Sequence, residues 1–340
     1  MSRTLSLSLI AFAACAPDPV ETPEAASQQP FAADAEGLTL AGTLRLPDRT
    51  GPVPGVVFVH GSGPNSRVQP MSGQLNMGFG VEIPVFRALS TALQGAGIAS
   101  YAYDKRTCGP FNGCATNDYP APPPDLTVGT FIADAAAACT ALGAHDAIAE
   151  VWIVGHSQGG QLAPAIVQAC DAAGGVMLAA PHDPIDALIK AQRDFTLDLL
   201  DTLGQPTDTQ PIRDLTQLVD DLAALRAGDS PSSATPGGSP VAFWQSWLDA
   251  SDTAPDIAAS LSKPLAAIQG DYDWNVPPAQ LDAWRASFDA SSAPRTTTLL
   301  PCVTHALNCV SQPDFQQITP ADIGAEVHAD VVEAVLEAIR

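Results

Sequence analysis

Short uncharged runs rich in Val, Ile, Leu and Phe alternate along the chain with longer segments of helical periodicity. The runs predict strands at residues 38–46, 53–59, 98–103, 151–154, 176–180, 265–269 and 296–300. The periodic segments predict helices at 84–94, 125–142, 158–172 and 321–339. Strands that alternate with helices favour a mostly parallel sheet covered on both faces. We therefore expect an α/β fold with a central sheet flanked by helices.

One stretch breaks this alternation. Residues 182–262 contain no convincing strand, but they predict amphipathic helices at 185–203 and 212–226, a Ser/Pro/Gly loop at 229–240 and a third helix near 241–249. We interpret residues 182–262 as a helical cap. The cap would be inserted into a core domain made of residues 36–181 and 263–340.

The amino-terminal residues have the pattern of an export signal. Arg3 precedes an apolar run at residues 5–14 that is too short to span a bilayer as a helix. The run ends in Phe-Ala-Ala-Cys, which resembles the lipobox of bacterial lipoproteins, and that resemblance implies a lipid on Cys15. Ordinary secretory cleavage and an uncleaved segment are the alternatives. Residues 16–35, rich in Pro and Ala, predict a tether, so we expect an envelope protein, either anchored to the outer membrane or periplasmic.

The net charge of the chain limits the classes of partner that it can bind. There are 37 acidic and 15 basic residues, a formal net charge of -22, while 46% of residues are hydrophobic. Nucleic-acid binding needs clustered Lys and Arg to neutralise phosphates, so this composition excludes it. We expect membrane contact only through an N-terminal lipid anchor.

Export also changes the interpretation of the cysteines. An even number remains beside Cys15, and an even number in an oxidising compartment suggests disulfides. Close spacing favours two pairs, which leaves a third pair by remainder, and free buried thiols are the alternative. The pairs are Cys108–Cys114, Cys302–Cys309 and Cys139–Cys170. The spacing of Cys and His predicts no metal site.

The most informative motif lies at residues 151–160. A buried strand, Val-Trp-Ile-Val, runs into Gly-His-Ser-Gln-Gly and then into a predicted helix. The glycines permit a sharp turn that lifts the hydroxyl of Ser157 above the edge of the sheet. The strand before and the helix after the motif favour Ser157 as a nucleophile.

A second loop supplies the groups that would stabilise an oxyanion. His-Gly-Ser-Gly-Pro at residues 60–64 follows the strand at 53–59. An oxyanion hole needs two N–H donors about 3 Å from the developing charge. We expect these donors to be the backbone amides of Gln158 and Ser62, with Gly63 as the alternative to Ser62.

A serine nucleophile needs a base and an orienting carboxylate, which follow it in the order acid, then histidine. Asp271 and Asp273 both follow the strand at 265–269, and the choice of Asp273 rests on the resemblance of G-x-x-D-x-x-V at residues 270–276 to a family pattern. His305 follows the last strand and precedes the last helix, which makes it the candidate base. A disulfide between Cys302 and Cys309 would restrict the loop that carries it.

These motifs together resemble those of α/β-hydrolase superfamily carboxylesterases, especially the cap-bearing bacterial group that is similar to serine aminopeptidases. The resemblance rests on residues 60–64, Tyr-Asp-Lys-Arg at 103–106, Gly-His-Ser-Gln-Gly-Gly at 155–160, residues 270–276 and Thr-His-Ala-Leu-Asn at 304–308. In such relatives Asp-Lys-Arg is followed by Gly, whereas Thr107 stands here.

The resemblance implies a serine hydrolase that cleaves a small-molecule ester through an acyl-enzyme, with no metal or organic cofactor. Trp274, Phe243 and Trp244 are candidates for the wall of the substrate pocket, although plain packing in the cap or the core is the favoured explanation for each. An N-terminal exopeptidase or a thioesterase would use the same triad. A surface protein that binds without catalysis is the alternative from another functional class.

Overall fold

The computed structural model describes residues 28–71, 81–108, 114, 125–312, 314 and 317–340. Cys15, the export signal and the first part of the predicted tether lie outside these residues. Among the helices of the described ranges, none combines the length and the apolar character that crossing a membrane requires.

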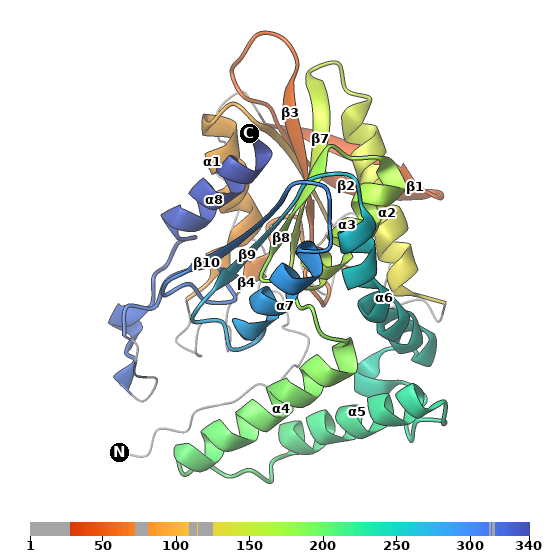
Figure 1. The fold of residues 1–340 in the computed structure, drawn as a ribbon, viewed down its shortest axis with the longest axis vertical. Helices are drawn as coiled ribbons and strands as arrows, with labels where there is room; N and C mark the ends of the chain where they lie inside the picture. Colours follow the sequence, from red (N-terminus) through yellow and green to blue (C-terminus); the bar gives the residue numbers. More distant parts are fainter. Residues whose placement is uncertain (1–27, 72–80, 109–113, 115–124, 313, 315–316) are drawn as a thin grey trace.

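An eight-stranded sheet forms the centre of the molecule, with strand order β1-β2-β6-β3-β7-β8-β9-β10 (Figure 1). The pairings β1–β2 and β2–β6 are antiparallel, and from β6 to β10 neighbouring strands are parallel. This is the mixed, mostly parallel sheet that the sequence predicts. The strands are β1 (Gln28–Ala35), β2 (Leu38–Arg45), β3 (Val53–Val59), β6 (Ala99–Tyr103), β7 (Ile148–His156), β8 (Gly174–Leu178), β9 (Leu265–Gly270) and β10 (Arg295–Leu300). A separate two-stranded pair consists of β4 (Pro70–Met71) and β5 (Ile83–Pro84).

Helices cover both faces of the sheet and enclose two separate apolar cores. Alternate residues of β3 point to opposite faces, so Val56 and Phe58 join one core whereas Val57 and Val59 join the other. The first core is closed by α1 (Val85–Gly95) and α8 (Ala329–Ile339), and the second by α2 (Val128–Gly143), α3 (Gln158–Cys170) and α7 (Ala279–Phe288). Burial on both faces explains why the central strands are almost continuously apolar.

Three helices stand between β8 and β9: α4 (Ile185–Thr202), α5 (Gln210–Ala227) and α6 (Val241–Ser260). The α4–α5 pair lies beyond the end of the sheet in Figure 1. Because α4 follows β8 directly, this is the end where the parallel strands have their carboxyl termini. By contrast, α6 packs on the sheet-covering helices, and Trp247 donates from its indole N–H to Oε1 of Gln161 on α3 at 3.0 Å.

The structure corrects the expectation that all of residues 16–35 form a tether. Residues 28–35 form β1, which pairs with β2 along its whole length and buries Ala33 and Ala35. Backbone pairing with β2 and the packing of Phe31 edge-on to Tyr101, 4.9 Å between ring centroids, stabilise this strand. Pro30 is tolerated because β1 is at the edge of the sheet.

Three helices also differ from the prediction. Helix α6 extends to Ser260 instead of ending near 249, and Ala254 and Ala258 continue its buried face. The last helix begins at Ala329 rather than at 321. Ile323 forms a bridge with Val310 and the Gly324 N–H donates to the Cys309 carbonyl at 2.9 Å, so residues 323–324 pair with the end of the His305 loop instead of forming helix. Helix α7 was not predicted, although Leu281, Trp284 and Phe288 have helical spacing and are buried.

Candidate active site

Ser157 occupies the turn between β7 and α3. Its φ of 54° and ψ of -117° place it in a region that L-residues rarely adopt. The turn is tight: a Cβ added at Gly159 would lie 2.2 Å from the carbonyl oxygen of Val59, and one at Gly155 would lie 2.1 Å from that of Gly159. Only glycine fits at these two positions, and the turn brings the serine against the loop that follows β3.

His305 and Asp273 meet at the same edge of the sheet. Asp273 follows β9 and His305 follows β10, and the two strands are parallel neighbours. Nδ1 of His305 lies 2.8 Å from Oδ2 of Asp273, and both side chains are buried. Because a carboxylate accepts, Nδ1 carries the proton and Nε2 has the free lone pair that a general base needs.

Asp273 is positioned by a further set of donors. Its Oδ1 accepts from the backbone N–H groups of Asn275 and Val276, each at 2.9 Å. Its Oδ2 also accepts from Nε2 of Gln269, a buried residue of β9, at 2.8 Å. The sequence analysis missed Gln269, although a lone amide in an otherwise apolar strand is a signal that could have found it.

His156 links the turn of Ser157 to the loop of His305. Its Nε2 donates to the backbone carbonyl of His305 at 2.8 Å, and the two rings lie 4.8 Å apart between centroids. Burial lowers the pKa of His156 to about 3, and the nearby His305 adds to this shift. His156 is therefore a neutral donor that fixes the position of the His305 backbone.

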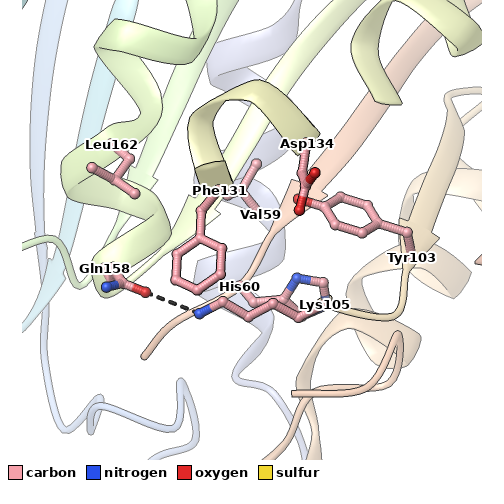
Figure 2. Close-up of a pocket in the computed structure, with 8 residues that line it drawn as sticks. All are labelled: Val59, His60, Tyr103, Lys105, Phe131, Asp134, Gln158 and Leu162. Carbon is pink, nitrogen blue, oxygen red and sulfur yellow. Dashed lines mark hydrogen bonds between the residues drawn. The ribbon is translucent and has the colours of Figure 1, made fainter. Parts of the chain in front are cut away.

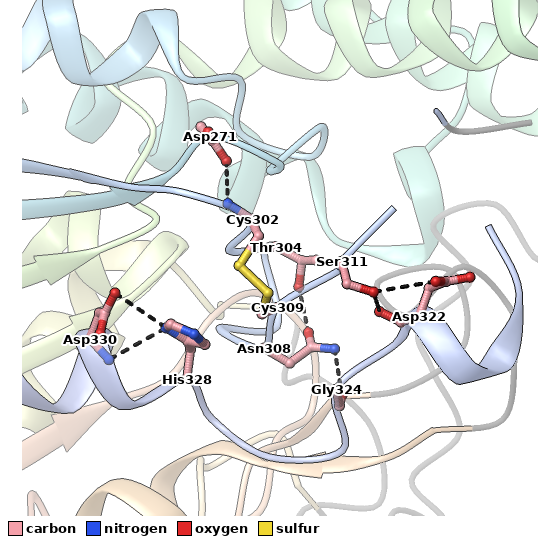
Figure 3. Close-up of a disulfide and its surroundings, with 10 residues drawn as sticks. All are labelled: Asp271, Cys302, Thr304, Asn308, Cys309, Ser311, Asp322, Gly324, His328 and Asp330. Atoms are coloured by element: carbon pink, nitrogen blue, oxygen red, sulfur yellow. Dashed lines mark hydrogen bonds and ion pairs between the residues drawn. A yellow bond between two sulfur atoms is a disulfide. The ribbon is translucent and has the colours of Figure 1, made fainter. Parts of the chain in front are cut away.

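The loop of His305 is closed by the Cys302–Cys309 disulfide (Figure 3). Inside the loop the Thr304 N–H donates to the Asn308 carbonyl at 2.8 Å, and Nδ2 of Asn308 donates to the Gly324 carbonyl at 2.8 Å. Asp271 accepts from the N–H of Cys302 at 2.6 Å. Asp271 thus supports the loop from outside, whereas Asp273 contacts the histidine itself.

The two cysteine pairs favoured by close spacing and the third pair left by remainder are the three disulfides of the structure. Disulfides of this number are typical of exported proteins. Among the described residues, Cys302, Cys309 and His328 bring potential metal-binding atoms within 4.8 Å of one another. The two sulfurs are bonded to each other, so in this state they are not thiolate ligands.

One lysine contacts both of the segments that are expected to form the oxyanion hole. Ser62 belongs to the loop after β3, and Gln158 is the first residue of α3. Lys105 donates from Nζ to the Gly61 carbonyl at 2.7 Å. The same Nζ donates to Oε1 of Gln158 at 2.9 Å (Figure 2). Burial lowers the pKa of Lys105 to about 7, and Asp134 opposes this shift.

Lys105 projects into a cavity beneath the Ser62 loop, and the Phe131 ring lies 4.2 Å from Nζ. The residues on either side of it in the chain form ion pairs, Asp104 with Arg67 at 2.6 Å and Arg106 with Asp134. The cavity is lined by Val59, His60, Tyr103, Lys105, Phe131, Asp134, Gln158 and Leu162.

The aromatic residues expected in a substrate pocket have different surroundings. Phe243 and Trp244 of α6 are buried, with Phe243 edge-on to Phe131 at 6.1 Å and the Trp244 indole N–H bonded to the Pro236 carbonyl. Trp274 adjoins Asp273 and stacks on Phe195 of α4 at 5.6 Å. Trp274 therefore connects the Asp273 loop to the α4–α5 pair.

A comparison with protein-family models identifies the family. The model for the alpha/beta hydrolase family matches residues 56–333. The chain belongs to the alpha/beta hydrolase family. The match begins in β3 and ends in α8, so it includes the turn of Ser157 and the loops of Asp273 and His305.

The relatives of this alpha/beta hydrolase include esterases. It is 28% identical over 246 residues to Esterase EstD of Thermotoga maritima, a match that covers 72% of this chain and 52% of the relative. The chain thus spans about half the length of that protein.

Two solved structures share the fold at low sequence identity. Est1E from Butyrivibrio proteoclasticus with bound ferulic acid has a TM-score of 0.51 and 17% identity, with 91% of this chain and 99% of that chain covered. Acetyl xylan esterase 1 from Thermoanaerobacterium sp. JW/SL YS485 has a TM-score of 0.53 and 14% identity, with 94% and 85% covered.

Proposed function

We propose that this alpha/beta hydrolase is a serine esterase that cleaves carboxylic esters by way of an acyl-enzyme. The observation that carries the proposal is the contact of His156, the neighbour of Ser157 in the chain, with the loop of His305. Ser157 has a strained backbone at the β7–α3 turn, and the hydrogen-bonded pair of His305 and Asp273 is tied to that turn through His156.

In the proposed reaction Ser157 attacks the ester carbonyl while Nε2 of His305 takes the hydroxyl proton. Asp273 holds the other ring nitrogen and stabilises the imidazolium. His305 then gives its proton to the departing alcohol, and water resolves the acyl-enzyme by the reverse steps. The backbone N–H groups of Gln158 and Ser62 would stabilise the oxyanion in both halves of the reaction.

The names of the relatives support an ester substrate, because the curated relative and both structural neighbours above are esterases. An exopeptidase would need free acidic side chains near the site to bind the substrate ammonium. Asp194 of α4 is already paired with Lys190 and Arg193, and the buried Asp221 of α5 accepts from Ser232. Asp198, Asp201 and Asp220 of the same two helices are exposed, so the preference for an ester substrate rests on the names of the relatives.

Hydrolysis of p-nitrophenyl esters from acetate to palmitate by the full chain tests the proposal. We expect turnover by the wild type and a loss of about 10⁴-fold or more in Ser157→Ala, since removal of the nucleophile leaves only the oxyanion hole and binding. Ser260→Ala is the matched control, because this exposed hydroxyl contacts only its own helix.

Hydrolysis that survives in Ser157→Ala would show that another group is the nucleophile. If the folded wild type hydrolyses none of the esters, an esterase function is wrong.

A further inference from the structure

We propose that Lys105 is a positioning residue that holds both halves of the oxyanion hole in place. The inference rests on the proposed esterase function and goes beyond it, because it assigns a role to a buried side chain that the triad chemistry does not use. Lys105 comes from the loop after β6 and is separated in sequence from Gly61 by 44 residues and from Gln158 by 53.

The first contact orients the N–H of Ser62. The Gly61 carbonyl and the Ser62 N–H belong to one planar trans peptide unit, so they point to opposite sides of the chain. Lys105 holds the carbonyl at 2.7 Å from its Nζ. The N–H of Ser62 must then point away from Lys105. A Cβ at Gly61 would lie 3.3 Å from the Cβ of Ser157, so this peptide adjoins the nucleophile.

The second contact anchors the other donor. Lys105 donates to Oε1 of Gln158, and the backbone N–H of Gln158 is the amide that directly follows the nucleophile. One buried Nζ therefore bridges the two segments that supply the two N–H groups. The distance between those segments fixes how well both donors reach a single oxygen.

Lys105 also polarises the donor that it orients. A strong donor at a carbonyl oxygen makes the N–H of the same peptide a better donor, and the effect grows where water is excluded. Nδ2 of Asn65 donates to the same carbonyl at 3.1 Å, but it is a neutral and only partly buried group. Lys105 is 5% exposed, so solvent screens its contribution little.

A positioning role predicts a specific kinetic signature. Lys105→Met removes both hydrogen bonds while keeping an unbranched apolar stem. We expect kcat for p-nitrophenyl acetate to fall roughly 10- to 100-fold with KM changed less than about twofold, because an oxyanion hole acts on the transition state rather than on the bound ester.

An inhibitor that forms an oxyanion gives an independent readout. When a trifluoromethyl ketone binds, the Ser157 oxygen bonds to the ketone carbon, the hydroxyl proton passes to His305, and the carbonyl electron pair moves onto oxygen. Its affinity should fall in Lys105→Met by about the same factor as kcat. A merely structural role would lower the thermal midpoint without this parallel loss.

Two further variants complete the experiment. Lys263→Met removes the same charge from a surface ion pair with Asp171, and we expect unchanged kcat. Gln158→Leu removes the hydrogen bond from Lys105 to Gln158 and keeps the one to the Gly61 carbonyl. We expect a smaller loss of kcat in this variant than in Lys105→Met. This variant also tests the proposal if Lys105→Met does not fold, in which case wild-type kcat in Gln158→Leu would overturn it.

A folded Lys105→Met enzyme with wild-type kcat and wild-type ketone affinity would overturn the inference. That outcome differs from failure of the esterase proposal, in which the wild type itself has no activity that depends on Ser157.

Discussion

At the scale of single residues, the site depends on side chains whose orientation is set by more than one contact. Ser157 keeps a backbone conformation that costs on the order of 1–3 kcal/mol, which the surrounding turn must supply. Asp273 receives four donors, three of which are independent of His305. The position of the Asp273 carboxylate therefore does not depend on His305, whereas the orientation of the His305 ring depends on Asp273.

Asp273→Asn tests this order of dependence. The amide keeps the shape of the side chain but favours the wrong tautomer of His305, so we expect kcat to fall by about 10⁴-fold with a folded protein. Asp271→Asn is the matched control, since Asp271 contacts only the Cys302 N–H among the groups described above, and a loss below about tenfold is expected there. Steady-state kinetics of both variants measure the two losses of kcat. A larger loss in Asp271→Asn than in Asp273→Asn would show that Asp271 is the acid of the triad.

At the scale of elements, the loop of His305 is held by a covalent link and by the backbone pairing of Cys309 and Val310 with residues 323–324. The disulfide closes a short loop around the histidine, whereas Cys139 and Cys170 join the ends of α2 and α3. Cys170 is at the far end of α3 from Ser157, roughly 18 Å along the helix. The two disulfides therefore have different consequences for the site.

We expect Cys302→Ala/Cys309→Ala to lower kcat at least several-fold and the free energy of unfolding by roughly 2–3 kcal/mol. The Cys139–Cys170 disulfide closes a longer loop. Its removal in Cys139→Ala/Cys170→Ala should therefore lower the free energy of unfolding more, by roughly 3–4 kcal/mol, with little change in kcat. Urea unfolding and ester hydrolysis measured on both variants separate the two effects. Equal loss of kcat in both would mean that the disulfide acts through general stability alone.

At the scale of the whole molecule, two fully buried histidines connect the fold to pH. His60 packs between Phe86 and Tyr103, and His156 lies behind the site. Burial lowers the pKa of each to about 3, with the charge of Lys105 adding to the shift at His60. Between pH 6.5 and 3 the unfolded chain binds protons that the native protein does not, so stability falls as the pH falls through this range.

Each histidine should contribute roughly 1 kcal/mol of lost stability per pH unit within that window. His156→Gln keeps a donor for the His305 carbonyl but does not titrate, so we expect a shallower loss of stability between pH 6 and pH 4. The difference between wild type and variant is the informative quantity, because 37 acidic residues also change charge. Urea unfolding at several pH values measures it, and parallel curves would contradict the assignment.

The sequence by itself determined the order of strands and helices from β2 to α8, apart from α7 and the short strands β4 and β5. Hydrophobic periodicity is a local property, and it identifies long elements well. The turn of Ser157 and the loops of Asp273 and His305 were also predictable, because strand ends and turn residues are local signals. Which of Asp271 and Asp273 bonds to His305 was a choice between neighbours, and the structure shows that bond for Asp273.

Only the tertiary structure decided the contacts that join distant segments. Strand β1 depends on pairing with β2 and on the contact of Phe31 with Tyr101, and its own short sequence does not reveal these distant partners. Lys105 and Gln269 gained their roles from partners that the fold brings within hydrogen-bonding distance. The physical reason is that periodicity reports which face of an element is buried, whereas a buried polar side chain is satisfied by whatever donor or acceptor the packing of other elements places beside it.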